Sequence, residues 1–414
     1  MTTASVRPRS LSRRSTLVIL LTLAAVLVGA WATRGARSGR PFVPAEDGQV
    51  LEKLPGGRST ARSRELVGLR QSLEERPDDL ELALALARRN IEESRSTSDP
   101  RFLGHAEAAL APWWNLPSPP PEVLLLRATI RQSTHDFEGA LQDLDAALRL
   151  APRDPQAWLT RSVVMTVRGD YAGARASCAP LSALTDDLVV RVCNAGVESV
   201  TGDAAGASAR LSASLDTASA PGSRVSPAER EWALSTLGEI AARLGDRAAA
   251  ERHFDAALSL DASDLYALAA WADLLLDEGR AAEVSARLAG RESSDGLLLR
   301  LAIAEAVARL PPAKAHADTL RARFDASRAR GDTVHRREEA RFALTIERDA
   351  RRALALARAN WEVQKEPWDV RVYLDAALAA GDREAASSVL SWLEVSRLED
   401  PAIAAVADQL RRLP

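Results

Sequence analysis

Residues 243–258 read RLGDRAAAERHFDAAL, in which a turn dipeptide is followed by a run of alanines and then by one phenylalanine. Gly245 can adopt the left-handed backbone conformation that commonly ends an α-helix, and Asp246 can cap the next helix. Alanines such as Ala250 let two helices approach closely, and Phe254 fills the space one turn further along. The stretch therefore predicts the corner of a helical hairpin, with Ala250 and Phe254 as structural residues.

The same corner recurs along the chain at nearly constant spacing. A turn dipeptide begins at positions 135, 169, 202, 245 and 279, so the successive steps are 34, 33, 43 and 34 residues. The long step contains TASAPGSRVSP (217–227), whose Ser, Pro and Gly content is typical of a lengthened loop. AAGDREAA places Gly381 a further 102 residues after position 279, which is three periods of 34. A period near 34 indicates a solenoid of helix–turn–helix repeats.

Each period predicts two amphipathic helices. The first apolar stripe carries Leu234, Leu237, Ala241 and Leu244, and the second carries Ala250, Phe254, Ala257 and Leu258. These residues are similar to the tetratricopeptide repeat pattern, Trp-x2-Leu-Gly-x2-Tyr, then Ala-x3-Phe, then Pro. The matching positions are Leu234-x2-Leu237-Gly238, Ala250-x3-Phe254, Pro152 and Trp158.

The resemblance covers 121–290 and 367–398 well, and 296–366 and 60–113 more weakly. It implies an all-α, right-handed solenoid of about nine hairpins over 61–414, with single helices at either end. An unrelated helical array is the alternative fold. By the same resemblance, one face of each first helix lines a concave groove that holds a segment of a partner protein.

The amino terminus predicts export. Residues 1–15 carry four arginines and no acid, and 19 uncharged residues separate Arg14 from Arg34. As a helix this run would span roughly 28 Å, enough for the hydrocarbon core of a membrane. We expect a basic cytoplasmic segment (1–15), a hydrophobic transmembrane helix (16–32), a linker (33–60) and repeats in the periplasm. Cleavage of a signal peptide near Ala32 is the alternative and would release a periplasmic or secreted protein.

Composition disfavours several functional classes. A net charge of −3 argues against a nucleic-acid-binding chain. The five histidines never lie three or four residues apart, which removes the simplest helical metal site. The sequence has no glycine-rich phosphate loop, Gly-x-Ser-x-Gly elbow or CxxC pair. We therefore predict no enzymatic activity, no catalytic residue, no cofactor and no metal. The excess of arginine over lysine and the abundant alanine indicate a GC-rich bacterial genome.

Two pairs of residues are predicted to come together. Arg127 in a first helix and Asp143 in the second helix of the same hairpin are expected to form a partly buried ion pair. A ligand-binding arginine is the alternative role for Arg127. Cys178 and Cys193 lie at similar heights on neighbouring antiparallel helices, and export would permit a disulfide between them. Buried free thiols are the alternative.

The resemblance also selects the groove residues. The inner faces of the later first helices offer aromatic and charged side chains: Trp232, Glu239, Tyr266, Asp273, Trp368, Arg371 and Asp375. An aromatic, acidic surface would suit an extended segment with hydrophobic and basic residues. A basic clamp for a terminal carboxylate is missing, so that type of ligand is not expected. Alternatively, the aromatic rings only cover the starts of their helices.

These observations predict a protein–protein interaction scaffold in the bacterial cell envelope, with a protein or peptide partner and no nucleic acid. Two alternatives remain open. The chain could be an accessory assembly or chaperone subunit for an envelope enzyme complex, or a self-associating structural element.

Overall fold

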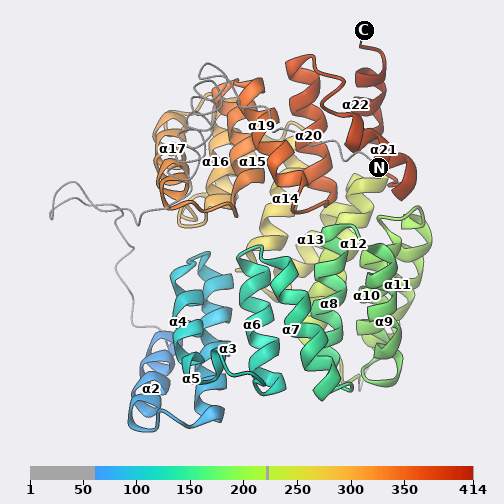
Figure 1. Cartoon of the computed structure of the whole chain (residues 1–414). Coiled ribbons are helices and arrows are strands. Elements are labelled where there is room, and N and C mark those ends of the chain that lie inside the picture. The colour runs from blue at the N-terminus through green and yellow to red at the C-terminus, as the bar shows by residue number, and fades with distance from the viewer. Residues whose placement is uncertain (1–60, 221–222, 414) are drawn as a thin grey trace, which may run out of the picture. The chain divides into compact units, whose positions relative to one another are not determined.

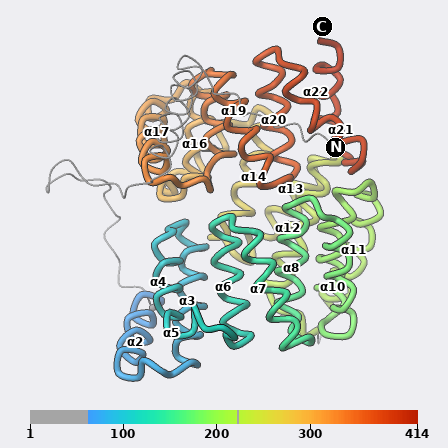
Figure 2. Tube along the Cα trace, viewed as in Figure 1, coloured from blue at the N-terminus to red at the C-terminus, as the bar shows by residue number. Residues whose placement is uncertain are grey.

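Helical hairpins follow one another along the chain in the computed structural model, which describes residues 61–220 and 223–413 (Figure 1). No β-strand occurs within these two ranges. The Cα trace in Figure 2 passes through the same succession of helices. The predicted all-α solenoid of helical hairpins is confirmed.

Nine hairpins, the number expected from the sequence, are present in the described residues. They are α3 (Leu80–Thr97) with α4 (Arg101–Ala109), α6 (Pro121–Ser133) with α7 (Phe137–Leu150), α8 (Pro155–Arg168) with α9 (Tyr171–Cys178), α10 (Asp187–Glu198) with α11 (Ala204–Ala218), α12 (Pro227–Leu244) with α13 (Arg247–Leu260), α14 (Leu265–Asp277) with α15 (Ala281–Leu288), α16 (Asp295–Ala308) with α17 (Ala313–Arg330), α18 (Arg336–Phe342) with α19 (Ala350–Trp361), and α20 (Pro367–Ala380) with α21 (Ser387–Ser396). Single helices, α2 (Ala61–Glu75) and α22 (Pro401–Arg411), precede and follow them.

Short irregular helices interrupt the regular pattern. The four-residue α5 (Ala111–Trp114) links α4 to α6, and a 3-10 helix (Ala179–Ala183) follows α9. A π-helix (Ala343–Glu347) extends α18 and ends at Arg348, which has a positive φ of 60°. This irregularity lies in 296–366, where the repeat pattern of the sequence is weak.

One compact unit comprises 54–324 and 333–414, and all contacts described below lie within it. Residues 325–332 belong to a different unit, in which the Asp332 amide donates to the Ser327 carbonyl at 3.0 Å. The predicted basic terminus, membrane helix and linker (1–60) lie outside the described residues. Among the helices that are described, none is both long and apolar enough to cross a membrane.

The corner at 245–246 has the chemistry expected from its sequence. Gly245 ends α12 with a φ of 82°, and the Asp246 side chain caps α13 by accepting the Ala249 amide at 3.0 Å. Ala250 and Phe254 are both buried. The corner at His135 differs because a non-glycine residue there adopts a positive φ of 61°. Asp136 nevertheless caps α7 in the same way, through the Gly139 amide at 3.0 Å.

Contacts also join residues about 200 positions apart. The Lys365 amide donates to the Val167 carbonyl at 2.7 Å, and the Ala204 amide donates to the Glu399 carboxylate at 2.7 Å. The Ser98 and Ser294 hydroxyls are 3.1 Å apart. We call this set of contacts the seam. The periodicity of the sequence does not predict it, because a repeat pattern reports contacts between neighbours.

Two mid-helix glycines provide a test of close helix packing. A Cβ at Gly238 would lie 2.6 Å from the ring of buried Phe254, whereas a Cβ at Gly196 in α10 would meet nothing within 4 Å. Gly238→Ala should therefore lower stability by about 1–3 kcal/mol through overpacking. Gly196→Ala should raise stability by about 0.5–1 kcal/mol through reduced backbone entropy in the unfolded chain. Chemical denaturation measures both changes, and equal effects of the two substitutions would contradict this account.

Candidate functional site

The predicted groove residues lie on three first helices: α12 carries Trp232 and Glu239, α14 carries Tyr266 and Asp273, and α20 carries Trp368, Arg371 and Asp375. Helices α12 and α14 are in contact, and the Arg371–Asp277 ion pair joins α14 to α20. The residues are therefore brought into one neighbourhood, but with different exposures and partners.

Tyr266 and Glu239 form the exposed part of this neighbourhood. The Tyr266 side chain is 60% exposed, and its hydroxyl donates a hydrogen bond to a carboxylate oxygen of Glu239 on the neighbouring first helix. Desolvation by the surrounding protein raises the pKa of Glu239, and it also raises the pKa of the Tyr266 hydroxyl. The ring is thus open to water and is held in place by this hydrogen bond.

Trp368 lies between two arginines. The Arg341 and Arg371 guanidinium carbons lie 4.7 Å and 4.9 Å from the centre of its ring, within cation–π distance. Arg371 also bonds Asp277 of α14 through its Nη2 at 2.8 Å, and its Nε lies 3.8 Å from Asp375. Arg371 thus pairs with Asp277, and Asp375 lies near the same guanidinium group.

Asp273 departs from the expectation of an open acidic groove. It is only 2% exposed, and its two oxygens accept from Arg300 and Arg341 at 2.6 Å each. Burial alone would raise the pKa of Asp273, but the two arginines outweigh it and lower that pKa. Asp273 is therefore a buried, neutralised group and not a free groove carboxylate.

Trp232 is a half-buried residue that packs against the core formed by α10, α11 and α12. Its contacts support a packing role for this ring, which is the alternative to lining the groove.

Sequence reasoning missed the arginines that neutralise the groove. Arg300 and Arg341 on α16 and α18 were not assigned to it, nor was Asp277. One signal was available, because Arg300 is the single charge in the apolar run LLLRLAIA of a first helix. The 68 positions that separate Arg341 from Asp273 gave no such signal.

A further charged cluster surrounds Arg337. Its Nη1 lies 2.8 Å from Glu366 and 3.6 Å from Asp369. Burial raises the pKa of Asp369 to about 6, although Arg337 opposes the shift. Burial lowers the pKa of His135, and nearby Arg337 lowers it further. The described part of the chain contains no group of acidic, histidine and cysteine side chains that could hold a metal ion.

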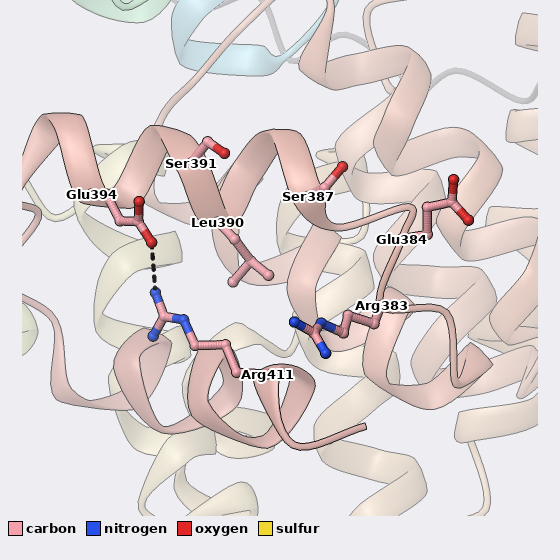
Figure 3. Close-up of a pocket in the computed structure, with 7 residues that line it drawn as sticks. All are labelled: Arg383, Glu384, Ser387, Leu390, Ser391, Glu394 and Arg411. Atoms are coloured by element: carbon pink, nitrogen blue, oxygen red, sulfur yellow. Dashed lines mark ion pairs between the residues drawn. The ribbon is translucent and has the colours of Figure 1, made fainter. Parts of the chain in front are cut away.

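A pocket of about 480 Å³ lies beside α21 and α22 (Figure 3). Its lining consists of Arg383, Glu384, Ser387, Leu390, Ser391, Glu394 and Arg411. Glu394 and Arg411 face each other at 3.8 Å. None of the predicted groove residues lines this pocket, and it offers no aromatic side chain as an anchor. We therefore place the candidate site at Tyr266 and Glu239.

Comparison with known proteins gives distant structural likenesses only. No family model matches the chain, and no curated protein matches it. The chain is similar to the APC/C hetero-tetramer Cut9–Hcn1 (14% identity, TM-score 0.39), covering 84% of this chain and 52% of that one. It thus spans about half the length of that protein.

It is also similar to a tetratricopeptide repeat protein from Parabacteroides merdae (15% identity, TM-score 0.32), covering 70% of this chain and 99% of that one. A third similar structure is human IFIT1 with m7Gppp-AAAA (12% identity, TM-score 0.38), covering 85% and 86% of the two chains. At these identities and TM-scores, the likenesses identify neither a partner nor an activity of this chain.

The Arg127–Asp143 pair joins the two helices of one hairpin. Arg127 bonds Asp143 through Nε at 2.9 Å and Nη2 at 2.6 Å, and their side chains are 13% and 5% exposed. Arg131, which the sequence did not indicate, adds a contact to Asp143 at 2.8 Å. Two guanidinium groups therefore share one buried carboxylate.

This sharing predicts unequal effects of removing the two partners. Arg127→Met leaves Asp143 paired with Arg131, whereas Asp143→Ala removes the acid that both guanidinium groups share and leaves Arg131 only the longer, 3.6 Å ion pair with Asp136. Asp143→Ala should cost about 3–5 kcal/mol, and Arg127→Met should cost clearly less. Asp145→Ala is the matched control, because that exposed acid pairs with Arg161 and should cost no more than about 1 kcal/mol. Equal melting temperatures for Asp143→Ala and Arg127→Met would refute the asymmetry.

Cys178 and Cys193 are joined by a disulfide that links α9 to α10, with a Cα–Cα distance of 5.8 Å and a sequence separation of 15. We predict that a thiol assay on unreduced, denatured protein from its natural compartment finds no free thiol. Reduction should lower stability by about 3 kcal/mol, because the closed loop restricts the unfolded chain. The Cys178→Ser/Cys193→Ser variant, which should not respond to reductant, is the control. Recovery of two free thiols would show that the disulfide does not form in the protein.

Proposed function

We propose that this protein is a protein-interaction scaffold whose partner is an extended segment bound along α12, α14 and α20. The observation that carries the proposal is Tyr266, an aromatic ring that is 60% exposed and is held by a hydrogen bond to Glu239. Exposed aromatic rings in a fixed orientation are common anchors of protein interfaces, since little side-chain entropy is lost on binding.

The charge of the groove defines the kind of segment that fits. Among the described ion pairs none involves Glu239, so this desolvated carboxylate lacks a cation in direct contact. A lysine or arginine of the partner could pair with Glu239 and stack on the Tyr266 ring. Asp273 is already neutralised by Arg300 and Arg341, so only Glu239 calls for a basic residue. We therefore propose that the partner segment places one basic residue at Glu239, flanked by hydrophobic residues.

We infer a binding role and not catalysis, because the other charged side chains of the groove hold one another in ion pairs and leave Glu239 without a second free charged group. Arg300 and Arg341 share Asp273, and Arg371 bonds Asp277. An acid–base catalyst would need one of these groups free to exchange protons with a substrate.

We further propose that the scaffold works in the bacterial cell envelope. The apolar run at 16–32 supports export, as an anchor with the repeats in the periplasm or as a cleaved signal peptide near Ala32. The Cys178–Cys193 bond also supports export, because disulfides persist in oxidising compartments.

Photocrosslinking in cells tests the position of the partner. A photoreactive amino acid at Tyr266 should capture a protein that mass spectrometry can identify. The same group at Leu260, an exposed residue at the end of a second helix, is the matched control and should not capture that protein.

With the captured partner, Tyr266→Ala should weaken binding by about 2 kcal/mol or more, and Tyr266→Phe should retain the part that depends on the ring. Neither substitution should change the melting temperature much, since the side chain is exposed. Trp232→Ala should lower the melting temperature because this ring packs against the core. Unchanged binding by Tyr266→Ala would show that the partner binds elsewhere.

A further inference from the structure

The hydrogen bonds of the seam link hairpin corners to loops at a nearly constant distance in the sequence. The separations are 196 positions for Ser98–Ser294, 195 for Ala204–Glu399 and 198 for Val167–Lys365 (365 minus 167). Each distance corresponds to about six repeats. The earlier partner always lies at the corner within a hairpin, and the later partner always lies just before α16, α20 or α22. The later hairpins therefore meet the earlier ones in one register.

Each of these bonds lies at a helix end, where backbone groups lack a partner within the helix. Val167 is in the last turn of α8, and the Lys365 amide donates to its carbonyl at 2.7 Å. Ser98 is the C-cap residue of α3, and Ser294 is the N-cap residue of α16, whose side chain caps no amide of its own helix. The later loops thus supply partners to the ends of earlier helices.

The amino end of α11 shows this exchange most clearly. At the corner of α12 and α13, Asp246 caps the second helix with its own side chain. The corresponding Asp203 makes no such bond to α11, and its carboxylate pairs with Arg210 at 2.6 Å. The Ala204 amide instead donates to Glu399 at 2.7 Å, and a carboxylate there also favours the positive end of the helix dipole. The helix is therefore capped from a repeat 195 positions away.

Side chains and a glycine bring the two sides of the seam close together. The ring of Tyr171, the first residue of α9, lies 6.3 Å from the ring of Trp392 in α21. A Cβ at Gly202 (φ 85°) would lie 3.0 Å from the Arg397 Cβ and 3.4 Å from its carbonyl oxygen, and neither atom is the end of a flexible chain. Gly245 has nearly the same φ, 82°, but its Cβ would meet nothing within 4 Å. Glycine is thus required at both corners for backbone conformation, and at Gly202 also for the seam.

We propose that the seam joins α8 to α11 and α19 to α22 into one cooperative unit, which opens and closes as a whole. In a solenoid whose repeats contact only their neighbours, a local change is felt in adjacent repeats. Here, opening of α19 to α22 would also remove the partners of helix ends in α8 and α11. Each set of helices therefore stabilises the other, although about six repeats separate them in the sequence. The inference goes beyond the scaffold function and holds whichever partner binds.

Hydrogen exchange in the native, unreduced protein tests the coupling, because it measures opening helix by helix. Gly202→Ala overpacks the seam and should speed amide exchange in α21 about tenfold, although α21 begins 185 positions later (387 minus 202). Gly245→Ala imposes the same backbone strain outside the seam and is the matched control. It should leave exchange in α21 unchanged.

Glu399→Ala tests the coupling in the opposite direction. Loss of the acceptor for the Ala204 amide should speed exchange about tenfold throughout α10 and α11, and not only in the first turn of α11. Glu399→Gln keeps an acceptor oxygen and should retain most of the protection. Glu394→Ala is the control, because that exposed acid lies 3.8 Å from Arg411 and takes no part in the seam.

The extent of the faster exchange decides the outcome. Faster exchange confined to the substituted hairpin, to its neighbours in the sequence and to the first turn of α11 would overturn the cooperative unit. If Gly202→Ala does not fold, the comparison of Glu399→Ala with Glu399→Gln decides by itself. Either result leaves the proposed partner site at Tyr266 to be judged by its own binding measurement.

Discussion

Close approach of two helices at a small residue is the constraint on which this structure depends. Gly238 lies against the ring of Phe254 with no room for a Cβ, and Ala250 is completely buried at the following corner. A solenoid repeat buries its apolar face only against its neighbours, so a hairpin held open at one corner would expose the next. The small residues therefore determine the spacing of the array as well as the packing of single hairpins.

The seam follows a different physical rule from the hairpins. Hairpin packing repeats the same contact in each unit, with small and aromatic side chains at fixed offsets. The seam instead combines backbone amides, a carboxylate, two serine hydroxyls and the Tyr171 and Trp392 rings, which share no sequence pattern. These contacts bring together hairpins that are distant in the sequence.

Electrostatics in the groove shows why the composition of a surface is a poor guide to its charge. The aromatic and acidic residues of α12, α14 and α20 were selected through the resemblance to the tetratricopeptide repeat pattern, and Tyr266 with Glu239 does form an exposed pair. Asp273 is nevertheless neutralised by arginines 27 and 68 positions away. The groove is therefore less acidic than the sequence of its helices suggests. Glu239 is the groove carboxylate that no described ion pair neutralises.

The sequence by itself determined the helical hairpin, its period, the approximate number of hairpins and the caps at Asp136 and Asp246, because these depend on residues within one repeat. It also placed Arg127 opposite Asp143 and Cys178 opposite Cys193, since helical spacing within adjacent helices predicts both pairs. Only the tertiary structure decided which charges of the groove are neutralised and that residues about 200 positions apart meet at a seam. Small rotations between successive repeats accumulate along a solenoid, and no local pattern records their sum.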